Sequence, residues 1–177
     1  MSSLRETISE IINDIPSSNV TLKKIISNYL FNNSFRLLLN FRIGKYFYKK
    51  NNILGKFISN YFRVRQITKR NCYISFNSKI GKNVYFPHPI GIVIGDGVVI
   101  KDNTTIYQQV TLGSHGKIGT ESKYPIIESG VKIFAGAKII GNVTIGENSI
   151  IGANAVVLNN VPANSVAIGV PARVKIQ

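Results

Sequence analysis

Apolar residues recur at every sixth position through much of the second half of the chain, from Ile74 to Val157. The thirteen positions are Ile74, Ile80, Phe86, Ile94, Ile100, Ile106, Leu112, Ile127, Ile133, Ile139, Ile145, Ile151 and Val157. The spacing slips by two residues before Ile94 and is interrupted for longer before Ile127. A helix of period 3.6 or a strand of period 2 does not produce this spacing, whereas a solenoid with three six-residue sides per coil does. The pattern therefore predicts a β-helix, a mainly β fold.

The third residue after each apolar position is Gly or Asn in ten of the thirteen repeats. These residues are Asn77, Asn83, Gly97, Asn103, Gly130, Gly136, Asn142, Asn148, Asn154 and Asn160. Because Gly and Asn adopt a left-handed backbone at low cost, we expect each coil to turn a corner there. The three exceptions are Pro89, Gln109 and His115. Breaks in a regular pattern are typical of functional sites, so we expect the site near them.

The fourth residue after the apolar position is small or β-branched in most repeats, which suits a narrow interior and predicts a second inward stack. Its members are Ser78, Val84, Val98, Thr104, Val110, Val131, Ala137, Val143, Ser149, Ala155 and Val161.

Composition divides the chain near residue 71. Residues 1–71 contain 13 Lys and Arg but 3 Asp and Glu, whereas residues 72–177 contain 9 and 5. The first part is expected to form a basic α-helical region, with helices over residues 4–15, 21–30, 33–48 and 53–65 and with Ser18 or Thr21 as a helix cap. The second part is expected to be the β-helix, with a loop at residues 113–126 that protrudes from it.

The N-terminal region is both basic and aromatic, with ten of the seventeen aromatic residues between Tyr29 and Phe62. Such a stretch is compatible with peripheral contact with an anionic membrane or with nucleic-acid binding. The favoured interpretation is a small helical cap whose aromatic side chains form a core and whose charges face solvent. No apolar run is long enough to span a membrane, and Cys72 has no partner for a disulfide, so we expect a cytoplasmic protein.

Three segments, FPHPIGIVIGDGVVI, QQVTLGSHGK and GVPARVK, together with the repeats, make residues 72–177 resemble the hexapeptide-repeat acyltransferases of the serine acetyltransferase-like branch. The resemblance implies a left-handed parallel β-helix, a homotrimer or a pair of trimers, and acetyl-CoA bound between neighbouring solenoids. It also implies a catalytic histidine at the position of His88.

The chain departs from serine acetyltransferases in three places. Pro87 replaces an Asp before the catalytic histidine, and Lys123-Tyr124 replaces an Arg-His pair. Tyr73 lies near the position of the carboxylate that orients that histidine. We therefore expect an acetyl-CoA-dependent O-acetyltransferase whose acceptor is a hydroxyl of a surface (capsular) polysaccharide or its sugar precursor, as in the capsule O-acetyltransferases that the chain also resembles. The alternative is serine O-acetyltransferase activity in cysteine biosynthesis.

Transfer of an acetyl group to a hydroxyl needs a general base near the working pH. His88 is the expected base, because Pro87 and Pro89 lift it out of the coil. His115 is the second candidate, either for the acceptor or for CoA. Counting repeats places Gln108 above His88, where it is a candidate to orient the imidazole. The remaining candidates for catalysis or acceptor binding are Gln109, Tyr73 and Tyr124, with ordinary exposed polar residues as the alternative.

Acetyl-CoA is the expected donor, and its contacts are expected on the loop and on the later coils. The candidate residues are Gly113, Ser114, Gly116, Lys117, Ala135, Gly136, Lys138, Ala153 and Arg173. The loop supplies backbone N–H donors, the small residues let the pantetheine approach the backbone, and the cations suit phosphates. For the cations, solvated charge is an equally good interpretation.

Other classes of solenoid fit less well. A γ-type carbonic anhydrase needs three histidines around one zinc, and this chain has two in total, so we expect no metal. A purely structural solenoid would keep an unbroken period. Nucleic-acid binding is not expected, because the solenoid carries only +4 of the net charge of +14.

Overall fold

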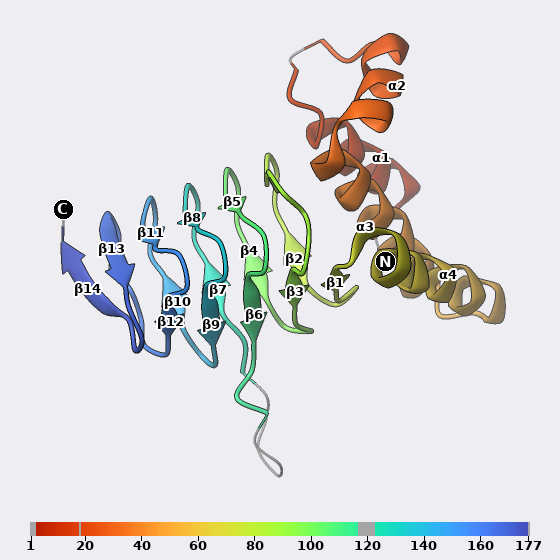
Figure 1. Cartoon of the computed structure of the whole chain (residues 1–177). Helices are drawn as coiled ribbons and strands as arrows, with labels where there is room; N and C mark the ends of the chain where they lie inside the picture. The colour runs from red at the N-terminus through yellow and green to blue at the C-terminus, as the bar shows by residue number, and fades with distance from the viewer. Residues whose placement is uncertain (1–2, 18, 117–122, 177) are drawn as a thin grey trace.

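The computed structural model describes residues 3–17, 19–116 and 123–176. Within these residues four helices come first and a β-helix follows, with the helices gathered at one end of the solenoid and the C-terminus at the other (Figure 1). The helices are α1 (Leu4–Asn13), α2 (Leu22–Phe31), α3 (Asn33–Lys50) and α4 (Ile53–Arg70). All four expected helices are present, and α3 and α4 end later than expected.

Polar side chains cap the starts of the helices. Thr21 caps α2, where its hydroxyl accepts a hydrogen bond from the backbone N–H of Lys24 at 3.4 Å. The other candidate cap, Ser18, lies outside the described residues. Asn32 and Asn52 cap α3 and α4 in the same way.

Arg42 of α3 joins the helical region to the β-helix. Its buried guanidinium binds the buried carboxylate of Asp14, with Nε 3.1 Å from Oδ2. It also donates to the carbonyl oxygens of Ile80 and Gly81, at 2.8 Å each. One apolar core continues from α3 into the first coils. The helices are therefore packed onto the first turns of the solenoid.

Three sheets form the sides of the solenoid. Face 1 contains β1 (Tyr73–Ile74), β3 (Val93–Ile94), β6 (Thr111–Gly113), β9 (Lys138–Ile140) and β12 (Val156–Val157). Face 2 contains β2 (Lys79–Ile80), β4 (Val99–Ile100), β7 (Ile126–Ile127) and β10 (Thr144–Ile145). Face 3 contains β5 (Thr105–Ile106), β8 (Lys132–Ile133), β11 (Ile150–Ile151), β13 (Ser165–Ile168) and β14 (Arg173–Ile176). The strands pair in parallel except for β13 and β14, so the predicted β-helix is confirmed.

Both inward stacks have the predicted register. All thirteen apolar positions of the six-residue period are buried, and so are the eleven small or β-branched positions. On face 1, Ile94 pairs with Leu112, which pairs with Ile139, which pairs with Val157. The core is therefore a continuous column of aliphatic side chains along the axis.

The corner prediction is right at two of the three corners. Left-handed residues occur at the expected positions between faces 2 and 3 and between faces 3 and 1, whereas between faces 1 and 2 positive φ falls on other residues, Gly116 and Gly141. Between faces 1 and 2, the residues at the expected positions do not have positive φ; they are Asn77, Gly97, Asn142 and Asn160. At this corner asparagine side chains make hydrogen bonds instead, since Asn160 Oδ1 accepts from the backbone N–H of Thr144 at 2.8 Å. Asparagine therefore has two structural roles in the repeat.

Candidate functional site

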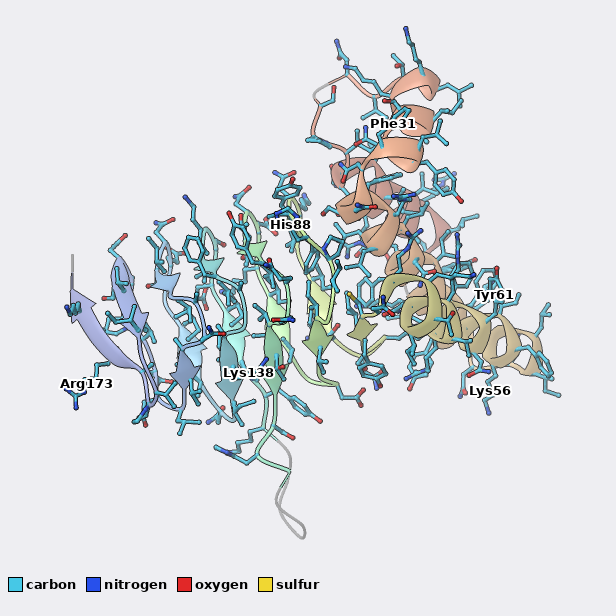
Figure 2. All side chains as sticks on the ribbon, in the orientation of Figure 1. Phe31, Lys56, Tyr61, His88, Lys138 and Arg173 are labelled. Carbon is cyan, nitrogen blue, oxygen red and sulfur yellow. The ribbon has the colours of Figure 1, made fainter. Side chains whose placement is uncertain are left out.

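His88 lies on a two-residue bulge between faces 3 and 1. Tyr85 pairs with Thr105 on face 3, and the chain reaches face 1 only at β3, so the two extra residues protrude. His88 is exposed and Pro89 is buried, while the N–H of Ile90 donates to the carbonyl of His88 at 2.8 Å. The structure thus confirms that the bulge lifts His88 out of the coil (Figure 2).

Gly91 takes the place that the repeat assigns to Pro89. Its φ is +67°, which proline cannot adopt, so the two-residue slip moves the corner onto a residue that tolerates it. The thiol of Cys72 donates to the carbonyl of Pro89 at 3.2 Å. Burial raises the pKa of Cys72 and keeps the thiol protonated for this hydrogen bond. The bulge is therefore fastened to the preceding coil.

A column of left-handed residues follows this corner from coil to coil, and we call it the His88 corner. Its members, with φ between 49° and 75°, are Asn71, Gly91, Gln109, Gly136 and Asn154. Backbone hydrogen bonds connect the levels, from Gly91 N–H to Asn71 O at 2.7 Å and from Gly136 N–H to Gln108 O at 2.9 Å. Ala135 and Ala153 lie on the same corner, so three expected pantetheine contacts share it with His88.

Gln109 is strained at this corner. It is the one member that is neither Gly nor Asn, and its φ is +58°. Lys138 Nζ donates to its carbonyl oxygen at 2.6 Å. Lys138, expected to be a phosphate contact, therefore supports the corner in this structure.

Two stacked aromatic side chains lie beside His88 and were not among the expected site residues. The Tyr107 and Phe134 rings stack with centroids 5.1 Å apart and planes 10° apart. The Tyr107 ring centroid lies 6.5 Å from that of His88, and Phe134 is 36% exposed. Tyr107 directly follows Ile106 and Phe134 directly follows Ile133, and these two inward residues pair on face 3. Listing the residue that follows each apolar position of the period would therefore have found the two aromatic side chains on neighbouring coils.

Gln108, the expected orienting partner of His88, does not hydrogen-bond to it. Among the described residues, no group hydrogen-bonds either ring nitrogen of His88, and the Gln108 amide oxygen is buried without a partner. The hydroxyl of Tyr73 accepts from Arg63 Nη1 of α4 at 2.9 Å. Tyr73 is therefore committed to the helical region.

The loop residues lie at a different corner, between faces 1 and 2. The N–H of Gly141 donates to Gly113 O at 2.8 Å, and His115 packs over Gly141. Ser114 and Gly116 follow β6 at this corner, where the Ser114 hydroxyl accepts from the Gly116 N–H at 3.4 Å. The structure therefore separates His115 from His88.

Tyr124 lies on the far side of the same loop, with its ring over Gly95 and Gly97. Lys117 lies outside the described residues. Arg173 is exposed on β14, near the end of the solenoid opposite to the helices (Figure 2). A single chain thus brings His88, Gln108, Gln109 and the small residues to one corner but leaves the loop residues at another.

Two hollows of about 350 and 250 Å³ lie against the helical region. Neither is lined by His88 or by any other expected site residue. The first lies between the end of α1, the start of α3 and residues 83–85, and the second is lined by residues that include Arg42 and Lys45. His88 itself is exposed at its corner.

Comparison with known proteins places the chain among transferases. Residues 124–159 match the family described as "Bacterial transferase hexapeptide (six repeats)", and residues 76–108 match "Hexapeptide repeat of succinyl-transferase". No curated protein matches the chain.

Solved structures match over nearly the whole chain. A serine acetyltransferase in complex with cysteine is 35% identical, with a TM-score of 0.83 over 98% of this chain and 67% of that enzyme. A serine acetyltransferase in complex with CoA is 33% identical, with a TM-score of 0.81 over 97% of this chain and 71% of the other. The serine acetyltransferase from Brucella abortus strain S19 is 30% identical, with a TM-score of 0.83 over 98% and 70%.

Repeat pattern, fold and comparisons together define a hexapeptide-repeat transferase built on a left-handed parallel β-helix. The chain belongs to the serine acetyltransferase-like branch of this family. It is an acyl-CoA-dependent acyltransferase.

Proposed function

We propose that the chain is an acetyl-CoA-dependent serine O-acetyltransferase with His88 as its general base. The observation that carries the proposal is the match to serine acetyltransferases over 97–98% of the chain. In this chain, the exposed His88 occupies the one bulge between faces 3 and 1 of the described coils. These relatives support serine better than the capsular polysaccharide acceptor that the sequence suggested.

The proposed chemistry is one acyl transfer. An imidazole nitrogen of His88 takes the proton of the acceptor hydroxyl while the hydroxyl oxygen attacks the thioester carbonyl carbon of acetyl-CoA. The tetrahedral oxyanion then collapses and the carbon–sulfur bond breaks. The sulfur of CoA leaves and takes the proton from His88, which yields the acetyl ester and CoA. Backbone N–H groups are the proposed stabilisers of the oxyanion.

We propose that the working unit is a homotrimer. The loop corner and the His88 corner point away from different edges of one solenoid, so a loop from a second copy is needed to place Ser114, His115 and Tyr124 near His88. Acetyl-CoA would then lie along Ala135 and Ala153 between the two solenoids. A monomer by light scattering that still consumes acetyl-CoA would contradict this assembly.

A sugar hydroxyl is the second candidate acceptor, and two observations favour it. Pro87 and Lys123-Tyr124 replace the residues expected to hold an amino acid. The exposed stack of Tyr107 and Phe134 offers a flat aromatic face, against which the C–H face of a sugar ring can pack.

Measurement of CoA release with serine, with an oligosaccharide of capsular type and with water alone separates these acceptors. Serine is expected to give O-acetylserine by mass spectrometry, and acetylated sugar with no O-acetylserine would establish the second candidate instead. Tyr107→Ala and Phe134→Ala sharpen the comparison, because a sugar acceptor predicts a higher KM for the acceptor with an unchanged KM for acetyl-CoA. Hydrolysis of acetyl-CoA without either product would contradict both proposals.

A further inference from the structure

Helix α4 presents a contiguous apolar face to solvent. The exposed fractions are 83% for Ile53, 67% for Leu54, 79% for Phe57, 61% for Tyr61, 48% for Val64 and 50% for Ile67. At 100° per residue these side chains share one side of the helix, while the buried Gly55, Ser59 and Gln66 lie on the other. Single exposed apolar residues are ordinary, but a contiguous row marks an interaction surface. We call these six side chains the α4 face.

Cations border the α4 face and carboxylates are absent from its surroundings in the sequence. Lys56 lies along one edge of the face, and Arg65 and Lys69 lie along the other. Lys49 and Lys50 end α3 immediately before the helix. No residue from 15 to 95 is Asp or Glu, a stretch that holds fourteen Lys and Arg. The face therefore combines an apolar centre with a strongly positive border.

We propose that the α4 face docks on an anionic lipid bilayer, with the helix axis in the plane of the surface. An apolar face bordered by lysine and arginine is the pattern of interfacial helices, whose apolar side chains enter the acyl boundary while the cations contact lipid headgroups. The helix has 18 residues and is about 27 Å long, which suits an interfacial element. No helix in the described part of the chain is long and apolar enough to cross a membrane.

Two other occupants fit this face less well. A second α4 face packed against the first would bring two positive borders together without a carboxylate on either border to compensate them. A nucleic acid would engage the cations but would leave Phe57 and its apolar neighbours exposed to water. Figure 1 shows α4 at the end of the molecule opposite to the C-terminus, and Figure 2 shows Lys56 and Tyr61 projecting outward from it. The face is thus accessible to a flat surface.

Co-sedimentation of the full chain with vesicles tests the proposal. Binding is expected to be about tenfold or more stronger to equal parts phosphatidylcholine and phosphatidylglycerol than to phosphatidylcholine alone, and to weaken with salt. The double variant Phe57→Glu/Tyr61→Glu is expected to lose binding by about tenfold or more, because two carboxylates replace inserted rings. Leu158→Glu is the matched control, since it adds a carboxylate at an exposed apolar residue far from α4, and it should bind as the wild type does.

A second variant separates the effect of the positive charges from that of the inserted apolar side chains. It also keeps the proposal testable if Phe57→Glu/Tyr61→Glu does not fold. Lys56→Gln/Lys69→Gln keeps the apolar face, so circular dichroism should show an intact fold while binding to anionic vesicles falls several-fold. Equal binding to both vesicle types, no binding at physiological salt, or unchanged binding by both variants would overturn the proposal. Light scattering without lipid completes the test: a larger assembly that Phe57→Glu/Tyr61→Glu dissociates would assign the face to a second copy instead.

Discussion

Gln109 stacks directly on Gly91 at the His88 corner, and both have a left-handed backbone, with φ of +58° and +67°. The N–H of Gln109 donates to the carbonyl of Ile90 at 2.8 Å, so the two levels are joined next to the bulge. A β-carbon on Gly91 would lie 3.2 Å from Cγ of Gln109. The shape of the bulge that carries His88 therefore depends on a strained glutamine and on a glycine.

Replacing Gln109 with Asn should stabilise the fold. Asparagine tolerates a left-handed backbone better than glutamine, so Gln109→Asn is expected to raise the free energy of unfolding by about 0.5–1 kcal/mol. Urea denaturation measures the change. Gly91→Ala is the opposing variant and should lower the same free energy by about 1–2 kcal/mol, because alanine meets both the positive φ and the contact with Gln109. A destabilised Gln109→Asn would show that the glutamine side chain supports the corner.

Replacing His88 with Ala should remove the base without disturbing the fold. His88 is exposed and stands outside the inward stacks, so thermal unfolding should be unchanged. The rate of acetyl transfer at saturating substrates should fall by about 10² to 10⁴, as expected when a general base is lost. His115→Ala should cost less. Full activity in His88→Ala would show that another group accepts the proton.

Replacing Arg42 with Met should loosen the helices from the solenoid. The change leaves the buried Asp14 carboxylate and two carbonyl oxygens without their donor, and it is expected to lower the free energy of unfolding by about 3–5 kcal/mol. Arg5→Met is the control, because it removes the same charge at an exposed position of α1 and should change stability by less than about 0.5 kcal/mol. Equal effects of the two variants in urea denaturation would show that the buried pair contributes little.

Lys45 should make the free energy of unfolding increase as the pH rises above about 8. Burial, and then repulsion from Lys49, lowers the pKa of Lys45 from 10.5 to about 8, although its Nζ donates to the carbonyl of Ser78 at 2.5 Å. The unfolded chain therefore binds more protons than the folded chain between pH about 8 and 10.5, and stability rises with pH across that window. The difference between wild type and Lys45→Met, measured by denaturation across this range, should show the rise. Parallel curves would mean that Lys45 titrates normally in the folded protein.

The sequence by itself determined the solenoid, its register and the exposure of His88. A six-residue period requires an inward side chain on every side of the coil, and all thirteen such positions are buried. The two extra residues before Ile94 do not fit a coil of six-residue sides, so they must protrude from it. His88, between Pro87 and Pro89, lies in this protruding segment. Inward positions follow from periodicity because only aliphatic side chains fill a narrow interior without unpaired polar groups.

The tertiary structure decided what surrounds His88. Tyr107 and Phe134 stack where the period places them, but they lie beside His88 only because the bulge carries His88 there, and Gly91 takes over the corner only because of how the bulge is absorbed. Counting repeats placed Gln108 near His88, but its amide oxygen is buried without a partner among the described residues. Outward side chains are not constrained by the period, since their contacts depend on stacking between coils, on the packed helices and on neighbouring molecules. That is the physical reason why the core could be read from the chain while the contacts of the site could not.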